Sequence, residues 1–426
     1  MKFHRANLVV GVGILFLLAT NSWGAQLTLN DCLQKARDNH PGLRTAAWDT
    51  RIAEQNVRQT SSAWYPRLDA QAGYTVQQAP QAAIIQGKIA EVQDADYAFG
   101  GIAVNYTLYD FGKREARIKH ARSLADATSN TFEARRTDVS LQVIETYFGI
   151  LETDKLVIAA REEITQVEQH RRMAQALFEE GVVTRNDILQ AEVRLAAARQ
   201  NLLATANQRE NIWLRLNYLT GSAPSFRADL TEDSSPLDSS RSPADVNGAL
   251  TRRPEILALR QGAAASQAEV QESRAAYFPE LFTRLALDYV ENSKYREQTI
   301  MSATVGLRIN LFDGFATTAA RDKALHSQSR SLDQLRQAEA QVRLEIDTAG
   351  NDLRVAGERI SVAESAIRQS EENLRINRER YQERVGTATE VLDAQTLLTQ
   401  TRTDYYRALF DRQVAAARLK RALGEL

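Results

Sequence analysis

The chain of 426 residues has a single cysteine, Cys32, so no disulfide can form within it. Proline is also scarce, and none lies between Pro80 and Pro224 or after Pro279. Because an interior proline breaks a helix, these gaps permit very long helices. The five histidines are scattered, and no glycine-rich loop follows an expected strand, so we expect no metal centre and no cofactor. The formal net charge of −1 gives no reason to expect a nucleic-acid partner.

Long apolar runs are missing as well. After residue 24 no stretch approaches the ~20 apolar residues that a membrane-spanning helix needs. The apolar run at residues 8–19 follows Lys2 and Arg5 and precedes small residues, which is the pattern of a secretory signal peptide at residues 1–24. The alternative, an N-terminal anchor helix, would require a longer run. An exported chain of this kind would cross a membrane only as strands.

Two copies of one unit make up the rest of the chain. "YPRL" at residues 65–68 corresponds to "FPEL" at 278–281, and "LYDFG" at 108–112 corresponds to "LFDGF" at 311–315. From these motifs onward the two copies match without a gap as far as the glycines at positions 221 and 424. The first copy is longer only between its "YPRL" and "LYDFG" motifs. A gap-free match over so long a stretch indicates that helix lengths are under geometric constraint.

The repeats set the expected domain boundaries. We predict a first repeat at residues 25–221 and a second at 250–426. Residues 222–249 between them are rich in proline and serine, which is typical of a linker at the surface.

Each repeat contains one segment with the periodicity of a β-hairpin, at residues 68–109 and 281–311. Apolar and polar residues alternate along the four expected strands, so each strand has one apolar and one polar face. The strands are 68–77, 97–109, 281–291 and 299–311. A half-buried sheet of a soluble sandwich is the alternative, but one hairpin per repeat, flanked by long helices, does not supply the strands that a sandwich needs. Strands of about ten residues have the length that spans an outer membrane.

The remainder of each repeat is predicted to be helical. The first has a long helix at 113–180 and a return helix at 186–220, and the second has the same pair at 316–384 and 387–423. A helix of this length extends roughly 100 Å and requires coiled-coil partners. An additional helix at 41–65, placed end to end with the return helix, would nearly match the first long helix. The return helices carry an apolar heptad pattern, interrupted in both copies by an arginine.

Both turns between a long helix and its return helix contain the sequence of a capping box. Thr184 is followed by Asp187, and Thr387 is followed by Glu390, at the spacing with which a threonine and an acid satisfy free backbone N–H groups. Capping alone accounts for Asp187 and Glu390. It does not account for Asp393, which lies one helical turn beyond Glu390 on the same face.

Four strands cannot close a barrel, because the smallest membrane barrels have eight. An open sheet edge in lipid leaves backbone groups without partners, at several kcal/mol each. The chain is therefore expected to form an oligomer in which several copies contribute strands and helices to one tube.

The sequence resembles the TolC-type outer-membrane efflux proteins. The resemblance rests on "LTLNDCLQKARDNHPGLRTA" at 27–46, the paired "YP" and "FP", the paired "LYDFG" and "LFDGF", and "TATEVLDAQTLLTQ" at 387–400. It implies a homotrimer with a 12-stranded barrel in outer-membrane lipid and a twelve-helix periplasmic tunnel. It also implies partners, namely a periplasmic adaptor protein and an inner-membrane pump of the RND or ABC type. The implied function is an exit duct for efflux or type I secretion.

The resemblance also implies roles for residues at the tips of the helices. The acidic constriction of the family falls on Glu390 and Asp393, which would give three pairs of carboxylates around the axis. No basic residue lies in "TATEVLDAQ", so we expect permeating ions to experience the charge of this ring. The side-chain latch of the family falls on Asp187 and Tyr381.

Two departures from the family concern the second turn. The family's linking arginine falls on Gly386, so that link is absent or is replaced by Arg384. Arg384 in turn occupies the glycine position that Gly181 keeps in the first copy.

Two other classes of function fit the sequence less well. A structural periplasmic coiled-coil protein would explain the helices but would leave the four alternating strands without a role. An enzyme is not indicated, because no set of nucleophile, base or metal ligands is visible.

Overall fold

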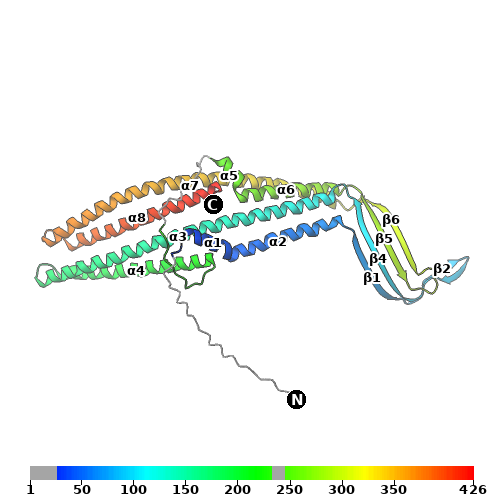
Figure 1. Ribbon diagram of the computed structural model, residues 1–426, viewed down its shortest axis with the longest axis horizontal. Coiled ribbons are helices and arrows are strands. Elements are labelled where there is room, and N and C mark those ends of the chain that lie inside the picture. The colour runs from blue at the N-terminus through cyan, green and yellow to red at the C-terminus, as the bar shows by residue number, and fades with distance from the viewer. Residues whose placement is uncertain (1–25, 233–244) are drawn as a thin grey trace, which may run out of the picture.

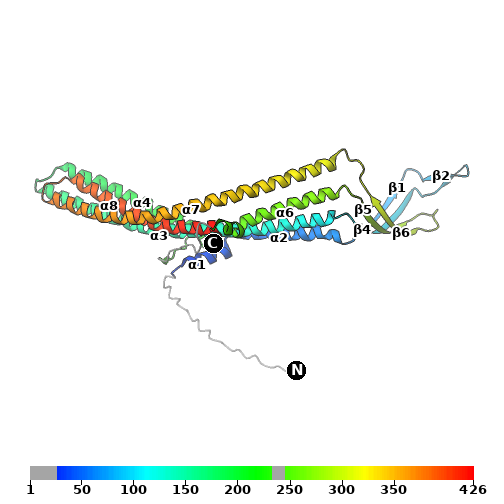
Figure 2. The same cartoon turned by 90° about the horizontal axis from the view of Figure 1, so that it is seen from above.

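A computed structural model describes residues 26–232 and 245–426. The expected signal peptide at 1–24 and residues 233–244 of the expected linker lie outside the described residues. The molecule is elongated, with a bundle of long helices at one end and a β-sheet at the other (Figures 1 and 2). Within the described ranges, none of the helices combines the length and the hydropathy needed to span a bilayer. The mainly helical class with a small β part and two tandem repeats, predicted from the sequence, is confirmed.

Four long helices dominate the structure. They are α3 (Lys113–Glu179), α4 (Arg185–Thr220), α7 (Ala316–Gln382) and α8 (Ala388–Leu423). Both long helices have 67 residues and both return helices have 36, as the gap-free match of the copies requires. Each long helix packs against its own return helix, and both pairs end in tight turns far from the sheet (Figure 1). We call these two turns the tip turns.

Shorter helices complete the bundle near the sheet. Helix α2 (Pro41–Ser61) continues into a 3₁₀ turn at Ser62–Trp64, and α6 (Pro254–Ala275) is its counterpart in the second copy. Each begins with proline, whose fixed φ suits the first helical position. Helix α3 packs against α2 and also against α6, so the two repeats are joined along their length (Figure 2). This pairing between repeats was not anticipated.

Two further helices lie beside the middle of the bundle. Helix α1 (Leu29–Asn39) is capped by Thr28 and Asp31, and α5 (Val246–Arg252) is capped by Asp245. The linker prediction was wrong at its end, because α5 includes its last four residues. The Asp245 carboxylate accepts from the Gly248 N–H at 3.1 Å, and this cap starts the helix before residue 250.

The largest apolar core lies where α1, α3, α4 and α8 meet. It contains Tyr147, Ile150, Trp213 and Leu216, all almost completely buried. The hydroxyl of Tyr147 lies 2.6 Å from the carbonyl oxygen of Thr231, which anchors the start of the linker to the core. The side chain of Cys32 on α1 is fully buried, and burial raises the pKa of its thiol to about 12.

Heptad positions of the return helices face their partners, as the sequence pattern predicted. The buried members include Ala191, Leu195, Ala394 and Leu398, whereas positions near the middle of α4 are only half-buried. Arg209 interrupts the pattern in α4, and its guanidinium pairs with Asp154 of α3. Many of the buried residues are alanines, which allow the helices to approach closely.

The main sheet has four antiparallel strands in the order β1–β4–β5–β6. Their bounds are Arg67–Val76, Asp96–Tyr109, Glu280–Val290 and Thr299–Arg308. The pairing of β4 with β5 joins the two copies into one sheet. The last strand was predicted to reach residue 311, but it ends at Arg308, where its pairing partner Glu280 begins β5.

The strand register places most of the apolar residues of the four strands on one face, which confirms the face predicted from their alternation, whereas Phe99, Phe282 and Val290 lie on the other face. Leu68 pairs with Val104, Val104 with Leu285, and Leu285 with Ala303. The adjoining row on the opposite face is polar and runs across the strands as Arg67, Asn105, Arg284 and Thr304. The sheet therefore has one mainly apolar and one mainly polar face across both copies.

A second, two-stranded sheet extends from the end of the β1–β4 hairpin (Figure 1). Its strands, β2 (Ala82–Ile85) and β3 (Lys88–Glu91), meet at a turn in which Gln86 and Gly87 both have positive φ. This hairpin was not predicted from the sequence. It occupies the stretch in which the first copy is longer than the second.

Candidate functional site

The first tip turn joins α3 to α4 through a glycine and a capping box. Gly181 has a φ of 74°, and the Val182 N–H donates to the Leu177 carbonyl at 2.9 Å, which closes the end of α3. The Thr184 N–H and hydroxyl donate to the Asp187 carboxylate at 2.9 and 3.0 Å. The carboxylate of Asp187 is therefore held at the start of α4.

The second tip turn repeats this geometry with different residues. Arg384 occupies the place of Gly181, with a φ of 65°. The Thr387 N–H donates to the Glu390 carboxylate at 2.9 Å, and the Glu390 N–H donates to the Thr387 hydroxyl at 3.3 Å. Both partners of the cap are thus in place at the start of α8.

Arg384 and Gly386 lie in the turn where the family resemblance places a linking arginine. A left-handed backbone is unfavourable for a residue with a Cβ, so Arg384 is strained relative to Gly181. The side chain of Arg384 is exposed and makes no ion pair within the part of the chain that the structure covers. A Cβ at Gly386 would lie 3.0 Å from the Cβ of Arg380 and 3.2 Å from the Glu390 carboxylate. The turn is therefore tight at the position where the family carries its arginine.

The two acids expected to form a ring differ in their surroundings. Asp393 is exposed on α8, one helical turn after Glu390. Glu390 is half-exposed, and Nη1 of Arg380 on α7 lies 3.7 Å from its carboxylate. Glu390 thus has a half-exposed basic neighbour that lies outside "TATEVLDAQ". Arg380 approaches Glu390 across the turn, from the end of the preceding helix.

The two tips contact each other through a small apolar cluster. Its buried residues come from α7 and α8, and Met173, Leu177 and Val183 from the first copy pack against it. The buried residues of this cluster, which we call the tip cluster, are Leu374, Tyr381, Ala388, Val391, Ala394 and Leu398. The tip cluster therefore connects the first helical pair to the second.

Tyr381 and His170 lie together at this contact. Their ring centroids are 5.3 Å apart, and both side chains are more than 95% buried. Burial raises the pKa of the Tyr381 hydroxyl, and the charge of Asp187 adds to the effect. No hydrogen bond joins Tyr381 to Asp187 among the described atoms, and the Tyr381 hydroxyl is buried without a partner there. His170 was not singled out by the sequence analysis, since a lone histidine in a helix carries no motif.

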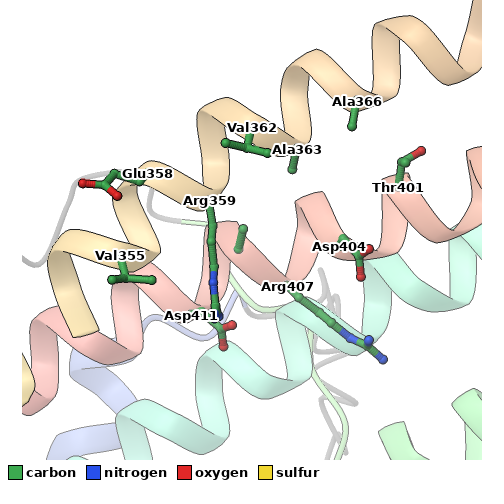
Figure 3. A pocket seen from close by; sticks show the side chains of 11 residues that line it. Val355, Glu358, Arg359, Val362, Ala363, Ala366, Thr401, Asp404, Arg407 and Asp411 are labelled. Carbon is green, nitrogen blue, oxygen red and sulfur yellow. The ribbon is translucent and has the colours of Figure 1, made fainter. Parts of the chain in front are cut away.

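A groove of about 550 Å³ lies between α7 and α8, well away from the tip turns (Figure 3). Val362 and Ala363 line it from α7, and Arg359 points toward Asp411 of α8 (Figure 3). The groove is lined by charges of both signs, and we assign no ligand to it. No cluster of side chains able to hold a metal ion occurs at residues 26–232 or 245–426.

Comparison with known proteins identifies the class. The sequence pattern of the family described as outer membrane efflux protein matches residues 32–222 and 246–425. The chain is 24% identical to the alkaline protease secretion protein AprF of Pseudomonas aeruginosa, over 96% of this chain and 87% of that protein. It is 21% identical to the outer membrane protein TolC of Vibrio cholerae, over 96% and 93% of the two chains. The crystal structure of VceC from Vibrio cholerae superposes with a TM-score of 0.81 at 20% identity, covering 93% and 96%.

The match over nearly all of the described residues shows that the chain belongs to the outer membrane efflux protein family. It is a channel protein of the TolC type and not an enzyme. It is located in the outer membrane, and its helices form a large periplasmic part.

Proposed function

We propose that three copies of this chain form an exit duct through the outer membrane. The duct serves a tripartite efflux or type I secretion system, in which a periplasmic adaptor connects it to an inner-membrane pump of the RND or ABC type. Three four-stranded sheets supply a 12-stranded barrel, and the long helices supply a periplasmic tunnel. The substrate enters at the tip turns and leaves through the barrel.

The observation that carries this proposal is the sheet with two free edges. Strands β1 and β6 each have a neighbour on one side only. Unpaired backbone groups in lipid cost several kcal/mol each, so the edges require partners. Pairing β1 of one copy with β6 of the next satisfies both edges, and a ring of copies closes the sheet. Three copies reach the twelve strands that the family resemblance implies.

The surface of the sheet supports insertion in a bilayer. Its apolar face includes Leu68, Met301 and Val305, which are between 68% and 84% exposed in the single chain. Lipid contact would remove these side chains from water, at about 25 cal/mol per Å².

Exposed aromatic side chains also gather where the sheet meets the helices. Phe111 stacks on Phe278 with ring centroids 5.1 Å apart, and Tyr65, Tyr109 and Phe312 are exposed nearby in the chain. Aromatic girdles of this kind occur at the membrane–water interfaces of barrels.

The tip turns supply the proposed gate. Three copies would bring Glu390 and Asp393 to the narrow periplasmic end, as the resemblance implies. Arg380 offsets part of the charge of Glu390, so Asp393 carries the larger share of the ring's field. In the proposed latch, the charge of Asp187 acts on the buried Tyr381 between the two tips of one copy, and the arginine link that Gly386 lacks is absent or is replaced by Arg384.

Cross-linking in the outer membrane tests the proposal. One cysteine on β1 and one on β6, such as Thr75→Cys with Thr304→Cys, are joined by a short bifunctional thiol reagent in isolated outer membranes. The strand register between copies is open, so neighbouring positions on β6 are scanned. The expected product is a ladder that ends at three chains. A matched pair on the neighbouring strands β4 and β5, Ala103→Cys with Ala286→Cys, should cross-link only within one chain.

A structural periplasmic coiled-coil protein is the alternative considered from the sequence. It predicts recovery of the chain in the soluble periplasmic fraction and no product that joins β1 to β6 between chains. Either result would contradict the exit duct.

A further inference from the structure

His170 of α3 and Tyr381 of α7 are deeply buried polar groups at the contact between the two tips. The exposed fractions of their side chains are 4% and 3%. The Nε2 atom of His170 and the hydroxyl of Tyr381 both lack a hydrogen-bond partner within residues 26–232 and 245–426. Buried polar groups normally have hydrogen-bond partners. Because His170 and Tyr381 lack them, a charge on either side chain would destabilise the contact between the tips.

We propose that His170 is a proton-sensitive latch: neutral His170 holds the two tips of one copy together, and protonation of His170 favours their separation. The proposal rests on the exit duct and its gate at the tips. It adds a residue and a physical trigger that the acidic ring does not supply. The burial of His170 is complete within one chain, so the latch does not depend on the geometry of the trimer.

The groups that face His170 favour its neutral form. The pKa of His170 is lowered to about 4: burial is the largest cause, the positive charge of Arg378 on α7 acts in the same direction, and Asp187 on α4 opposes the shift. On α3 itself, the adjacent Arg171 lies 3.8 Å from Glu192 of α4. The α8 residues of the tip cluster are apolar and cannot stabilise an imidazolium. No carboxylate forms a hydrogen bond with His170 in the described structure.

The sign of the pH dependence follows from this shift. Separation of the tips would expose His170 to water, where its pKa returns to about 6.5. The joined tips then have their full stability above pH 6.5 and lose it as the pH falls from 6.5 toward 4. Acidification from pH 7.5 to 5.5 should increase the ratio of separated to joined tips about tenfold.

Conductance in planar bilayers tests the latch in the full-length protein. The open probability of wild-type channels should rise about tenfold between pH 7.5 and 5.5 on the periplasmic side. His170→Gln keeps a polar side chain without a titrating group, and its open probability should not change with pH. His120→Gln is the matched control: His120 is half-buried on the same helix near the sheet, and its Nδ1 lies 2.9 Å from the Ala265 carbonyl. This variant should respond as the wild type does.

A labelling measurement keeps the inference testable without a conductance signal. Ala388 belongs to the tip cluster and is 1% exposed, whereas Val193 on α4 is 71% exposed. Cysteine at Ala388 should react with a membrane-impermeant thiol reagent about tenfold faster at pH 5.5 than at pH 7.5, once normalised to cysteine at Val193. The increase should vanish in His170→Gln and shrink in Arg378→Gln, because loss of that charge brings the pKa of His170 closer to its ordinary value.

The outcomes separate the latch from the duct. A wild-type channel whose opening and labelling do not change with pH contradicts the latch alone. A pH response that persists in His170→Gln also overturns it. Absence of any channel in the wild type, combined with pH-dependent labelling of Ala388→Cys, contradicts the duct and leaves the latch supported.

Discussion

Gly181 and Arg384 occupy the same place in the two tip turns and adopt nearly the same left-handed backbone, at φ 74° and 65°. After each of them, the next N–H donates to a carbonyl five residues back at 2.9 Å, and a threonine then caps the return helix. The shape of the turn is thus a property of the backbone and the cap. Even an arginine adopts it when the surrounding contacts require it.

The charges of the two turns differ where the shapes agree. In the first turn the capping carboxylate, Asp187, lies near the buried His170 and Tyr381. The second carries Glu390, with Arg380 3.7 Å away, and the exposed Asp393. We infer a division of roles: the capping carboxylate of the first turn acts at the contact between the tips, and the carboxylates of the second turn supply the proposed field in the pore.

Shortening only one of the long helices should disturb the match between the two tip turns most. Removal of seven residues from the middle of α7 alone would displace the second tip from the first and break the tip cluster. We expect loss of assembled trimer, measured by cross-linking in outer membranes. Equivalent deletions in α3, α4, α7 and α8 together should assemble better than the single deletion. Normal assembly of the single deletion would show that the two copies do not depend on a common register.

Arginine substitutions on the apolar face of the sheet should have the next largest effect. They should weaken membrane insertion to the same extent in both copies. Leu68→Arg in the first copy and Val305→Arg in the second should each cost about 2–4 kcal/mol near the bilayer midplane. Gln71→Arg and Ser302→Arg on the polar face are the controls. Resistance to extraction from the membrane measures the outcome. Equal behaviour of the two faces would be incompatible with the assigned orientation.

The caps should have smaller and matched effects. Thr184→Ala and Thr387→Ala each remove a capping side chain, at about 1 kcal/mol. Hydrogen exchange of the amides at the starts of α4 and α8 reports the local stability of each turn. We expect faster exchange only in the turn that carries the substitution. Acceleration in both turns would indicate that the tips unfold as one unit.

Substitutions at the left-handed position should change the stability of the turns least, and in opposite directions in the two turns. Gly181→Ala introduces a Cβ where φ is positive and should destabilise the first turn by about 1 kcal/mol. Arg384→Gly removes such a Cβ and should stabilise the second turn by up to about 1 kcal/mol. Hydrogen exchange of the amides at the starts of α4 and α8 measures both effects. Destabilisation by Arg384→Gly would reveal a contact of the arginine side chain in the assembled protein.

Much of the fold follows from local patterns. Strand alternation predicted the two faces of the sheet, and the absence of proline together with the heptads predicted the long helices. The β2–β3 hairpin was missed because its strands are four residues each, too short for a period to be recognised. The end of β6 depends on where its partner β5 begins. Helix α5 was hidden by the polar residues around it, although Asp245 is a good helix cap.

The candidate site was less predictable. The capping residues follow from a motif three residues apart, but Arg380 reaches Glu390 across a turn, and His170 reaches Tyr381 from another helix. Such contacts depend on the packing of the two helical pairs, which no local period encodes. The pairing of α3 with α6, which joins the two repeats, was not predicted for the same reason.

Ion selectivity in planar bilayers tests the division of roles between the two turns most directly. The double variant Glu390→Gln with Asp393→Asn retains the size of both side chains and removes six charges from a trimer, and Thr387 still caps α8. The control, Asp187→Asn in the first turn, removes three. The wild type and the control should prefer cations and be blocked by polyvalent cations from the periplasmic side. The double variant should lose both properties, as measured by reversal potential and block. Unchanged cation preference and block in the double variant would contradict the account and leave Glu390 as a capping residue only.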